Sequence, residues 1–399
     1  MRVSASLGLL AALLASPAAA QQPACADLPG LVLAPGTTDV KPYLARIAPH
    51  LATADPPLTL AYVPLGSCTA LDYVLQDVDV ASTAVYWPGE YDDDGKPIEA
   101  ACDIAPGARA QLALSDVTVE TCTGGAPPAD VGQFPSLIQG FGFVVPPDSS
   151  QVAITATEAY FIFKFGGEPG REVPPWTDPA AIHIRTPASS TQLLIGLAAG
   201  IRGTMWSPNL VTTHNGSGDL LAAVAAENAT GNADQTLGIL SLQRYDGARD
   251  QVRMLAFEAF DQSCLGAVYP DSTPASFDKR NVRDGHYPIW GSLWTMTAVD
   301  GSGQPTDAGA ARLIDFIAGT TPQNGADPIA DAALAGAVPP CAMSVRRAYD
   351  GAPLERFDPA EPCGCVFEQV VTGGTACVAC DEGQPCDEGV CRFGFCEAR

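Results

Sequence analysis

Short apolar runs alternate with amphipathic stretches along most of the chain, from residue 31 to about residue 297. Residues 31–33 and 58–63 are mainly apolar runs next to glycine or proline, which predicts buried strands. Residues 40–51 and 67–76 place apolar side chains at the spacing of one helix face. Strands that alternate with helices are typical of α/β folds, so we expect an α/β architecture.

The same patterns predict further elements. They comprise a hairpin at residues 84–98, strands at 141–145 and 182–184, a further apolar run at 237–242, and helices at 157–163, 191–201 and 312–317. The Asp92-Asp93-Asp94-Gly95 run in the hairpin is typical of a turn, and a calcium loop is disfavoured because the twelve-residue ligand pattern is absent.

Two crossing segments divide the predicted elements into two lobes. The chain leaves one group of elements through residues 141–145 and returns to it near residues 261–268. We therefore place the first lobe at residues 26–142 and 264–345, and the second lobe at residues 143–263.

The N-terminus predicts export. Residues 1–20 combine a positive start, an apolar stretch and the small residues Ala18-Ala19-Ala20, as in a secretory signal peptide. No later stretch is long and apolar enough to span a bilayer. Lipid attachment at Cys25 is disfavoured because residues 22–24 are a poor lipobox. We expect the protein in the periplasm, at the cell surface or outside the cell.

The charge and the cysteine content limit the kinds of molecule and ion that the protein is expected to bind. The net charge of −24 disfavours nucleic acid and anionic membranes, which bind basic surfaces. Thirteen cysteines in an exported chain indicate disulfides rather than metal ligands, and the odd number leaves at least one without an intramolecular partner. We predict a Cys102–Cys122 disulfide around the strand at residues 108–119, and a second between Cys264 and Cys341.

A change in composition after Pro362 marks a small C-terminal segment. Seven cysteines lie there: Cys363, Cys365, Cys377, Cys380, Cys386, Cys391 and Cys396. So short a segment cannot bury a core and needs covalent cross-links. We predict a linker at residues 346–362 and a cysteine-rich tail at 363–399. Half a zinc site at Cys377 and Cys380 is the alternative, which the exported context disfavours, so no metal is expected.

Four loops carry the candidate chemistry, each at a strand end or before a helix. Their residues are Thr37 and Thr38, Ser67, Ser115 and Asp116, and Arg185 with Ser189, Ser190 and Thr191. Free backbone N–H groups at a helix N-terminus hold anions, and serine and threonine hydroxyls add directional donors. Each loop alone is also explained by ordinary helix capping.

The order of these loops resembles the phosphate-binding protein of bacterial phosphate ABC transporters, a type 2 periplasmic binding protein. The resemblance covers residues 30–297, and its most specific stretch is Trp176-Thr177-Asp178-Pro179, residues 182–185 and residues 189–191. Ser115-Asp116 and the run at 141–145 are similar to further parts of that family. The resemblance implies a two-lobed α/β fold with a ligand cleft between the lobes, here followed by a disulfide-rich segment.

The resemblance also implies a site and a ligand. Thr37, Thr38, Ser67 and Asp116 would come from the first lobe, and Arg185, Ser189, Ser190 and Thr191 from the second. The implied ligand is a small oxyanion, with phosphate preferred because Asp116 can accept a hydrogen bond from a protonated phosphate oxygen, which sulfate lacks. An ABC transporter membrane component would be the partner. We expect a monomer without a cofactor.

The chain departs from the family at three positions. Ser190 stands where glycine is usual, and Pro187 replaces an acid that pairs with the arginine in some members. Asp39 follows Thr38 where an apolar residue is common, which adds a negative charge near the site unless its side chain points to solvent.

The sequence also bears on two other classes of function. Enzyme activity is disfavoured because the chain has no Gly-x-Ser-x-Gly, no His-Glu-x-x-His and no phosphate-binding Gly-rich Lys loop. An extracellular adhesion or scaffold protein that keeps the fold without binding a ligand stays open as the alternative.

Overall fold

The computed structural model of the chain describes residues 22–81, 83–260, 262, 266–381, 384–387 and 389–397. The predicted signal peptide and Cys264 lie outside the described residues. Within them, no helix has both the length and the apolar character needed to cross a bilayer.

The secondary structure alternates as the sequence pattern predicts. The strands are β1 (Leu31–Thr37), β2 (Thr59–Leu65), β3 (Thr83–Tyr86), β4 (Ala100–Asp103), β5 (Ala113–Ser115), β6 (Val131–Val145), β7 (Ala153–Thr155), β8 (Ile182–Arg185), β9 (Thr213–His214), β10 (Leu237–Ser241), β11 (Arg253–Met254), β12 (Ala256–Glu258), β13 (Trp290–Ala298), β14 (Val345–Arg346), β15 (Glu355–Arg356), β16 (Val390–Arg392) and β17 (Phe395–Glu397). The helices are α1 (Lys41–Ala52), α2 (Ser67–Leu75), α3 (Val119–Thr123), α4 (Ala156–Phe165), α5 (Ser190–Ala198), α6 (Ser217–Ala226), α7 (Leu242–Asp246), α8 (Arg280–Arg283), α9 (Ala308–Ala318), α10 (Pro328–Leu334) and α11 (Gly364–Thr372).

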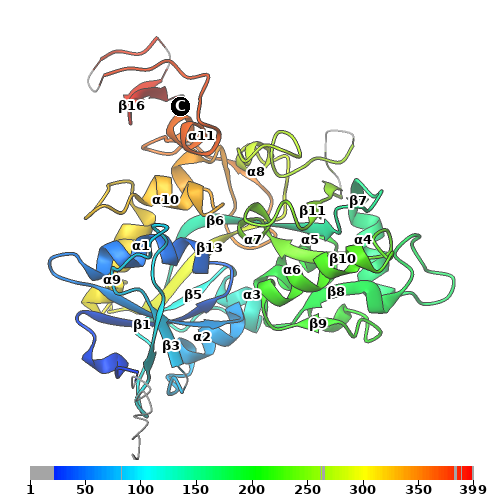
Figure 1. The fold of residues 1–399 in the computed structure, drawn as a ribbon. Helices are drawn as coiled ribbons and strands as arrows, with labels where there is room; N and C mark the ends of the chain where they lie inside the picture. Colours follow the sequence, from blue (N-terminus) through cyan, green and yellow to red (C-terminus); the bar gives the residue numbers. More distant parts are fainter. Residues whose placement is uncertain are drawn as a thin grey trace, which may run out of the picture.

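One curved sheet runs through both lobes, in the order β4-β3-β2-β1-β5-β13-β6-β10-β8-β9 (Figure 1). We call β1–β5 with α1–α3 and α9 the first lobe, and β8–β10 with α4–α7 the second lobe. The long strand β6 joins them, because its first part pairs with β13 and its last part with β10. The two-lobed α/β prediction is confirmed, whereas the residue limits given above for each lobe stay a prediction.

Each lobe has its own hydrophobic core. Leu44 of α1 and Leu114 of β5 belong to the core of the first lobe. Phe143 of β6, Ile195 of α5 and Leu240 of β10 belong to the core of the second. Because α1, α5 and α6 are anchored through these apolar faces, the residues at their N-termini are held where the two lobes meet.

Disulfides connect the chain differently from the prediction. Cys102 pairs with Cys25 and Cys122 pairs with Cys68, so the predicted Cys102–Cys122 disulfide is wrong. The N-terminal segment runs beside β4, where Asp103 N–H donates to the carbonyl of Pro23 at 2.9 Å, and this brings Cys25 to Cys102. Because the sulfur of Cys25 is in this disulfide, Cys25 has no free thiol to which a lipid could be attached.

The C-terminal segment is cross-linked and attached to the body of the protein. Cys341 pairs with Cys363 rather than with Cys264. The remaining pairs within the segment are Cys365–Cys377, Cys380–Cys391 and Cys386–Cys396. The carboxylate of Glu397 accepts the Cys365 N–H at 2.9 Å, which fastens the chain end to the start of α11.

The stretch that precedes this segment also contacts the first lobe. Asp350 is buried, and its Oδ2 accepts the Thr118 N–H at 2.8 Å and the Thr121 hydroxyl at 2.7 Å. Residues 346–362 therefore hold α3 in place as well as connecting the body to the tail.

Candidate functional site

Two buried aspartates lie where the lobes meet. Asp39 precedes α1 and Asp116 follows β5, so both come from the first lobe. Their side chains are 1% and 0% exposed, respectively. Buried carboxylates need hydrogen-bond donors or cations close by, and most of those donors belong to the second lobe.

Asp116 is bonded by one hydroxyl from each lobe. Its Oδ2 accepts Thr37 Oγ1 at 2.7 Å and Ser190 Oγ at 2.8 Å. Thr37 ends β1 and Ser190 begins α5. The backbone N–H of Asp116 points to Ser67 Oγ at 3.5 Å, which places Ser67 at the edge of the site. The bond to Ser190 therefore links the first lobe to the second.

Among the described residues, the hydrogen-bond donors to the Asp39 carboxylate all come from the second lobe. Its Oδ1 accepts Ser217 Oγ at 2.6 Å and Ser241 Oγ at 2.8 Å, and its Oδ2 accepts Thr191 Oγ1 at 3.1 Å. Thr191 and Ser217 lie in the first turns of α5 and α6, where the helix dipole favours negative charge. The Asp39 side chain therefore does not point to solvent. Of the two aspartates at the site, it accepts the larger number of hydrogen bonds.

We call this group the carboxylate cluster: Thr37, Asp39, Asp116, Ser190, Thr191, Ser217 and Ser241. Each of its hydroxyl groups donates to one of the two carboxylates.

Arg185 brings a positive charge to the cluster from the end of β8. Its side chain is buried, and it donates to the carbonyls of His214 at 3.2 Å and Asn215 at 3.0 Å. The same guanidinium also donates to Ser217 Oγ, which in turn donates to Asp39. Burial lowers the pKa of Arg185, and the charge of Asp39 opposes that shift. Arg185 is therefore fixed to the second lobe and reaches Asp39 through a hydroxyl.

Thr38 Oγ1, beside the cluster, and Asp116 Oδ1, within it, are among the buried polar atoms that have no hydrogen-bond partner in the described part of the chain. The first is a donor and the second an acceptor, so a group that offers one oxygen acceptor and one hydroxyl would satisfy both. A protonated oxyanion has both features.

The protonation of Asp116 is set by its surroundings. Its pKa is raised to about 7, first because burial disfavours the charged form and then because Asp39 lies close. The hydrogen bonds from Thr37 and Ser190 act in the opposite direction. The side chain can therefore gain or lose a proton near neutral pH.

This shift predicts a stability that falls as pH rises. Unfolding returns the Asp116 pKa to about 3.9, so between about pH 4 and 7 the folded state holds a proton that the unfolded state has lost. From pH 5 to pH 7 the free energy of unfolding should drop by roughly 2 kcal/mol because of this group. Urea denaturation of the wild type and Asp116→Asn across this range measures it, and equal slopes for the two proteins would contradict it.

The structure brings together most of the residues predicted for the site. Thr37, Asp116, Ser190 and Thr191 belong to the carboxylate cluster, and Arg185 adjoins it. Thr38 and Ser67 lie at its edge. Ser189 precedes α5 without a side-chain bond to that helix. Whether these residues bind a ligand stays a prediction.

Three members of the cluster were not among the predicted site residues: Asp39, Ser217 and Ser241. Ser217 follows Asn215-Gly216 ahead of an apolar helix, so the rule that selected Ser189–Thr191 could have selected it as well. Ser241 ends a buried strand in the same manner as Asp116 follows one. Asp39 could not have been selected in this way, because an acidic residue is not expected to take part in a site that binds an anion.

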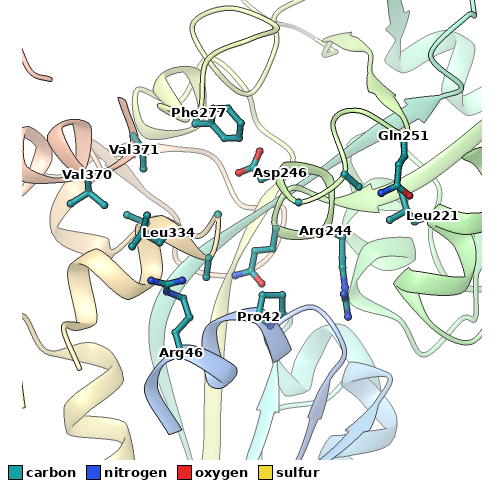
Figure 2. Close-up of a pocket in the computed structure, with 16 residues that line it drawn as sticks. Pro42, Arg46, Leu221, Arg244, Asp246, Gln251, Phe277, Leu334, Val370 and Val371 are labelled. Carbon is teal, nitrogen blue, oxygen red and sulfur yellow. The ribbon is translucent and has the colours of Figure 1, made fainter. Parts of the chain in front are cut away.

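A cavity of about 550 Å³ lies beside the cluster, between α1 and α7 (Figure 2). Pro42, three residues after Asp39, lines it, as do Gln243 and Arg244, which follow Ser241. Leu334 of α10 and Val370 of α11 complete its wall on the side of the C-terminal segment. The two lobes are therefore not closely packed against each other on this side of the cluster.

Comparison with known proteins supports the fold. No family model matches the chain, and no curated protein does. A solved phosphate ABC transporter substrate-binding protein from Clostridium perfringens, with bound phosphate, overlaps with a TM-score of 0.52 and 14% identity, over 77% of this chain and 99% of that one. An ABC-type phosphate transport receptor from Vibrio cholerae overlaps less well, with a TM-score of 0.43 and 15% identity, over 68% and 88%. The first likeness shows the two-lobed fold of type 2 periplasmic binding proteins.

Proposed function

We propose that this chain is an exported solute-binding protein that closes its lobes around a small oxyanion, with inorganic phosphate as the leading ligand. The observation that carries the proposal is the convergence of three hydroxyl groups on the carboxylate of Asp39, one of which, that of Ser217, also accepts a hydrogen bond from Arg185. A carboxylate is itself an oxyanion, so donors arranged around it suit a phosphate oxygen pair as well.

Asp116 favours a protonated oxyanion such as phosphate over sulfate. Its unpartnered Oδ1 can accept a hydrogen bond from a ligand hydroxyl, and Thr38 Oγ1 can donate to a ligand oxygen. Both phosphate forms near neutral pH carry at least one hydroxyl, whereas sulfate carries none. The net charge of −24 repels anions at long range, so binding would depend on these local donors.

Export and partnership belong to the same proposal. Six disulfides are expected of a protein folded in an oxidising compartment. An ABC transporter membrane component is the partner that a phosphate-binding protein of this fold would serve. We propose a monomer that binds its ligand without converting it.

A scaffold or adhesion protein that keeps the fold without a ligand is the second candidate. The observation that favours it is the burial of Asp39 among the donors, because a filled site has no room for a second anion.

Calorimetric titration of the mature protein with phosphate, sulfate and arsenate separates the two. Saturable heat with phosphate and arsenate supports the binding protein. If the wild type and an Asp39→Ala variant both give no heat with any of the three anions, the scaffold is the better explanation.

A further inference from the structure

We infer that Asp39 is a built-in occupant of the inter-lobe site: its carboxylate holds the lobes closed without ligand and must leave before an oxyanion can bind. The first half of the inference stands on the contacts alone, and the second half rests on the proposed function. We call the interaction of Asp39 with Thr191, Ser217 and Ser241 the Asp39 latch.

The contacts of Asp39 are those of a ligand rather than of a helix cap. An acid just before a helix ordinarily accepts N–H groups of that same helix. Asp39 instead accepts three hydroxyls that lie 152, 178 and 202 residues further along the chain, on α5, on α6 and at the end of β10. Its own helix, α1, has no side-chain cap. The side chain therefore bonds across the lobe interface and contributes nothing to the local turn.

The latch accounts for most of the polar contacts that connect the two lobes at the site. Three hydroxyls reach Asp39, and a fourth, from Ser190, reaches Asp116. A backbone bond from Cys68 N–H to the carbonyl of Ala188 at 3.1 Å lies beside them. The neighbouring interface between α1 and α7 encloses the cavity of about 550 Å³ instead of close apolar packing. Hydrogen bonds to charged groups therefore help to close the lobes here, together with apolar contacts of Val117, Cys68 and Cys122 with the core of the second lobe.

A tethered carboxylate competes strongly with a free anion. Asp39 is attached to the loop between β1 and α1, so its effective concentration at the donors is at least millimolar. A free oxyanion must in addition lose its translational freedom on binding. Competition of this kind lowers the apparent affinity by the fraction of molecules in which the site is vacant.

Removing the carboxylate should therefore strengthen oxyanion binding. Minor conformations of proteins are typically about 0.1–10% populated, so Asp39→Ala should bind phosphate about 10- to 1,000-fold more tightly than the wild type. Asp39→Asn, which keeps the volume but removes the charge, should show a smaller gain in the same direction. Asp130→Ala is the matched control, because Asp130 is exposed, precedes β6 and carries the same charge. It should bind phosphate as the wild type does.

Two further measurements test the latch without phosphate. Small-angle X-ray scattering should show a closed wild type and Asp130→Ala, but a more open Asp39→Ala, all without ligand. Formate, a free carboxylate, should bind to Asp39→Ala in calorimetry and close it again, and should give no heat with the wild type.

The outcomes separate the latch from the proposed function. Formate rescue and opening of Asp39→Ala without any phosphate binding would support the latch and overturn phosphate as the ligand. Equal phosphate affinity in the wild type and Asp39→Ala, with equal scattering curves, would overturn the latch and leave the binding function intact. If Asp39→Ala does not fold, Asp39→Asn supplies the same comparisons, and an unchanged scattering curve and phosphate affinity in that variant would overturn the latch.

Discussion

At pH 8 the wild-type protein is expected to bind phosphate about 10⁴-fold more tightly than sulfate, and Asp116→Asn should lose most of that preference. A deprotonated Asp116 accepts the phosphate hydroxyl but faces only lone pairs on sulfate. Sites that bond a ligand hydroxyl reject analogues without it by about 10⁴–10⁵-fold. Asparagine offers a donor in place of the acceptor, so sulfate binding should rise relative to phosphate.

The preference should also depend on pH. Because the pKa of Asp116 is raised to about 7, the side chain takes up a proton below that pH and can then donate to sulfate. The ratio of the two affinities, measured by calorimetry at pH 6 and pH 8, should therefore be smaller at pH 6. Asp39 competes with both anions alike, so the latch cancels from this ratio.

Asp350→Asn is the matched control for this experiment. Asp350 is another buried acid with a raised pKa, but it bonds Thr118 and Thr121 outside the carboxylate cluster. Its charge is the smallest of the effects that shift the Asp116 pKa, and it raises that pKa. Its replacement should therefore leave the phosphate-to-sulfate ratio unchanged at pH 8, where Asp116 is mostly deprotonated in both proteins. Equal affinities of the wild type for the two anions at pH 8 would remove the role assigned to Asp116.

Arg185→Ala is expected to reduce the free energy of unfolding by about 3–5 kcal/mol, because it removes the positive charge that reaches the buried Asp39 through Ser217. It also removes the donor to the carbonyls of His214 and Asn215. Phosphate, arsenate and sulfate should all bind more weakly by a similar factor, because the charge serves every oxyanion alike. Urea denaturation and calorimetry measure the two effects.

The stability and binding effects of Arg185 can be separated. Arg185→Lys keeps the charge but cannot make the same set of planar bonds, so it should recover part of the stability. Arg202→Ala removes an exposed arginine of the second lobe and serves as the charge control. If Arg185→Ala had the same free energy of unfolding as the wild type, the charge of Arg185 would not be needed to stabilise the buried Asp39.

Local patterns in the sequence predicted many elements of the fold, although they missed α6 and β13. Tyr43, Leu44, Ile47 and Leu51 recur at helical spacing, and all four are buried on one face of α1. The apolar run at 141–145 is the last part of β6. Such patterns are readable because burial imposes the period of a helix or strand on neighbouring residues. The two-lobed architecture was implied by the resemblance of the site loops to phosphate-binding proteins.

Polar residues at strand ends and helix starts likewise indicated much of the candidate site. Thr37, Asp116, Arg185 and Ser190–Thr191 stand at strand ends or helix starts, where a carboxyl edge of a sheet or a helix N-terminus exposes polar groups. The sequence placed these residues at the same edge of the sheet without showing which of them would bond to which.

Pairings between distant residues were decided only by the tertiary structure. Cys25 meets Cys102 because the N-terminal segment lies along β4, and Cys68 meets Cys122 because α2 lies against α3. Asp39 meets Ser217 and Ser241 because β6 carries the second lobe back over the first. No periodic pattern reports a contact across about 200 residues, since it depends on the register of β6 with both of its neighbours. The sequence by itself thus indicated some of the polar groups where the lobes meet, such as Thr37, Asp116 and Arg185, as candidates for binding an oxyanion. The tertiary structure added Ser217 and Ser241 to them and decided that one of the chain's own carboxylates, that of Asp39, lies among these groups.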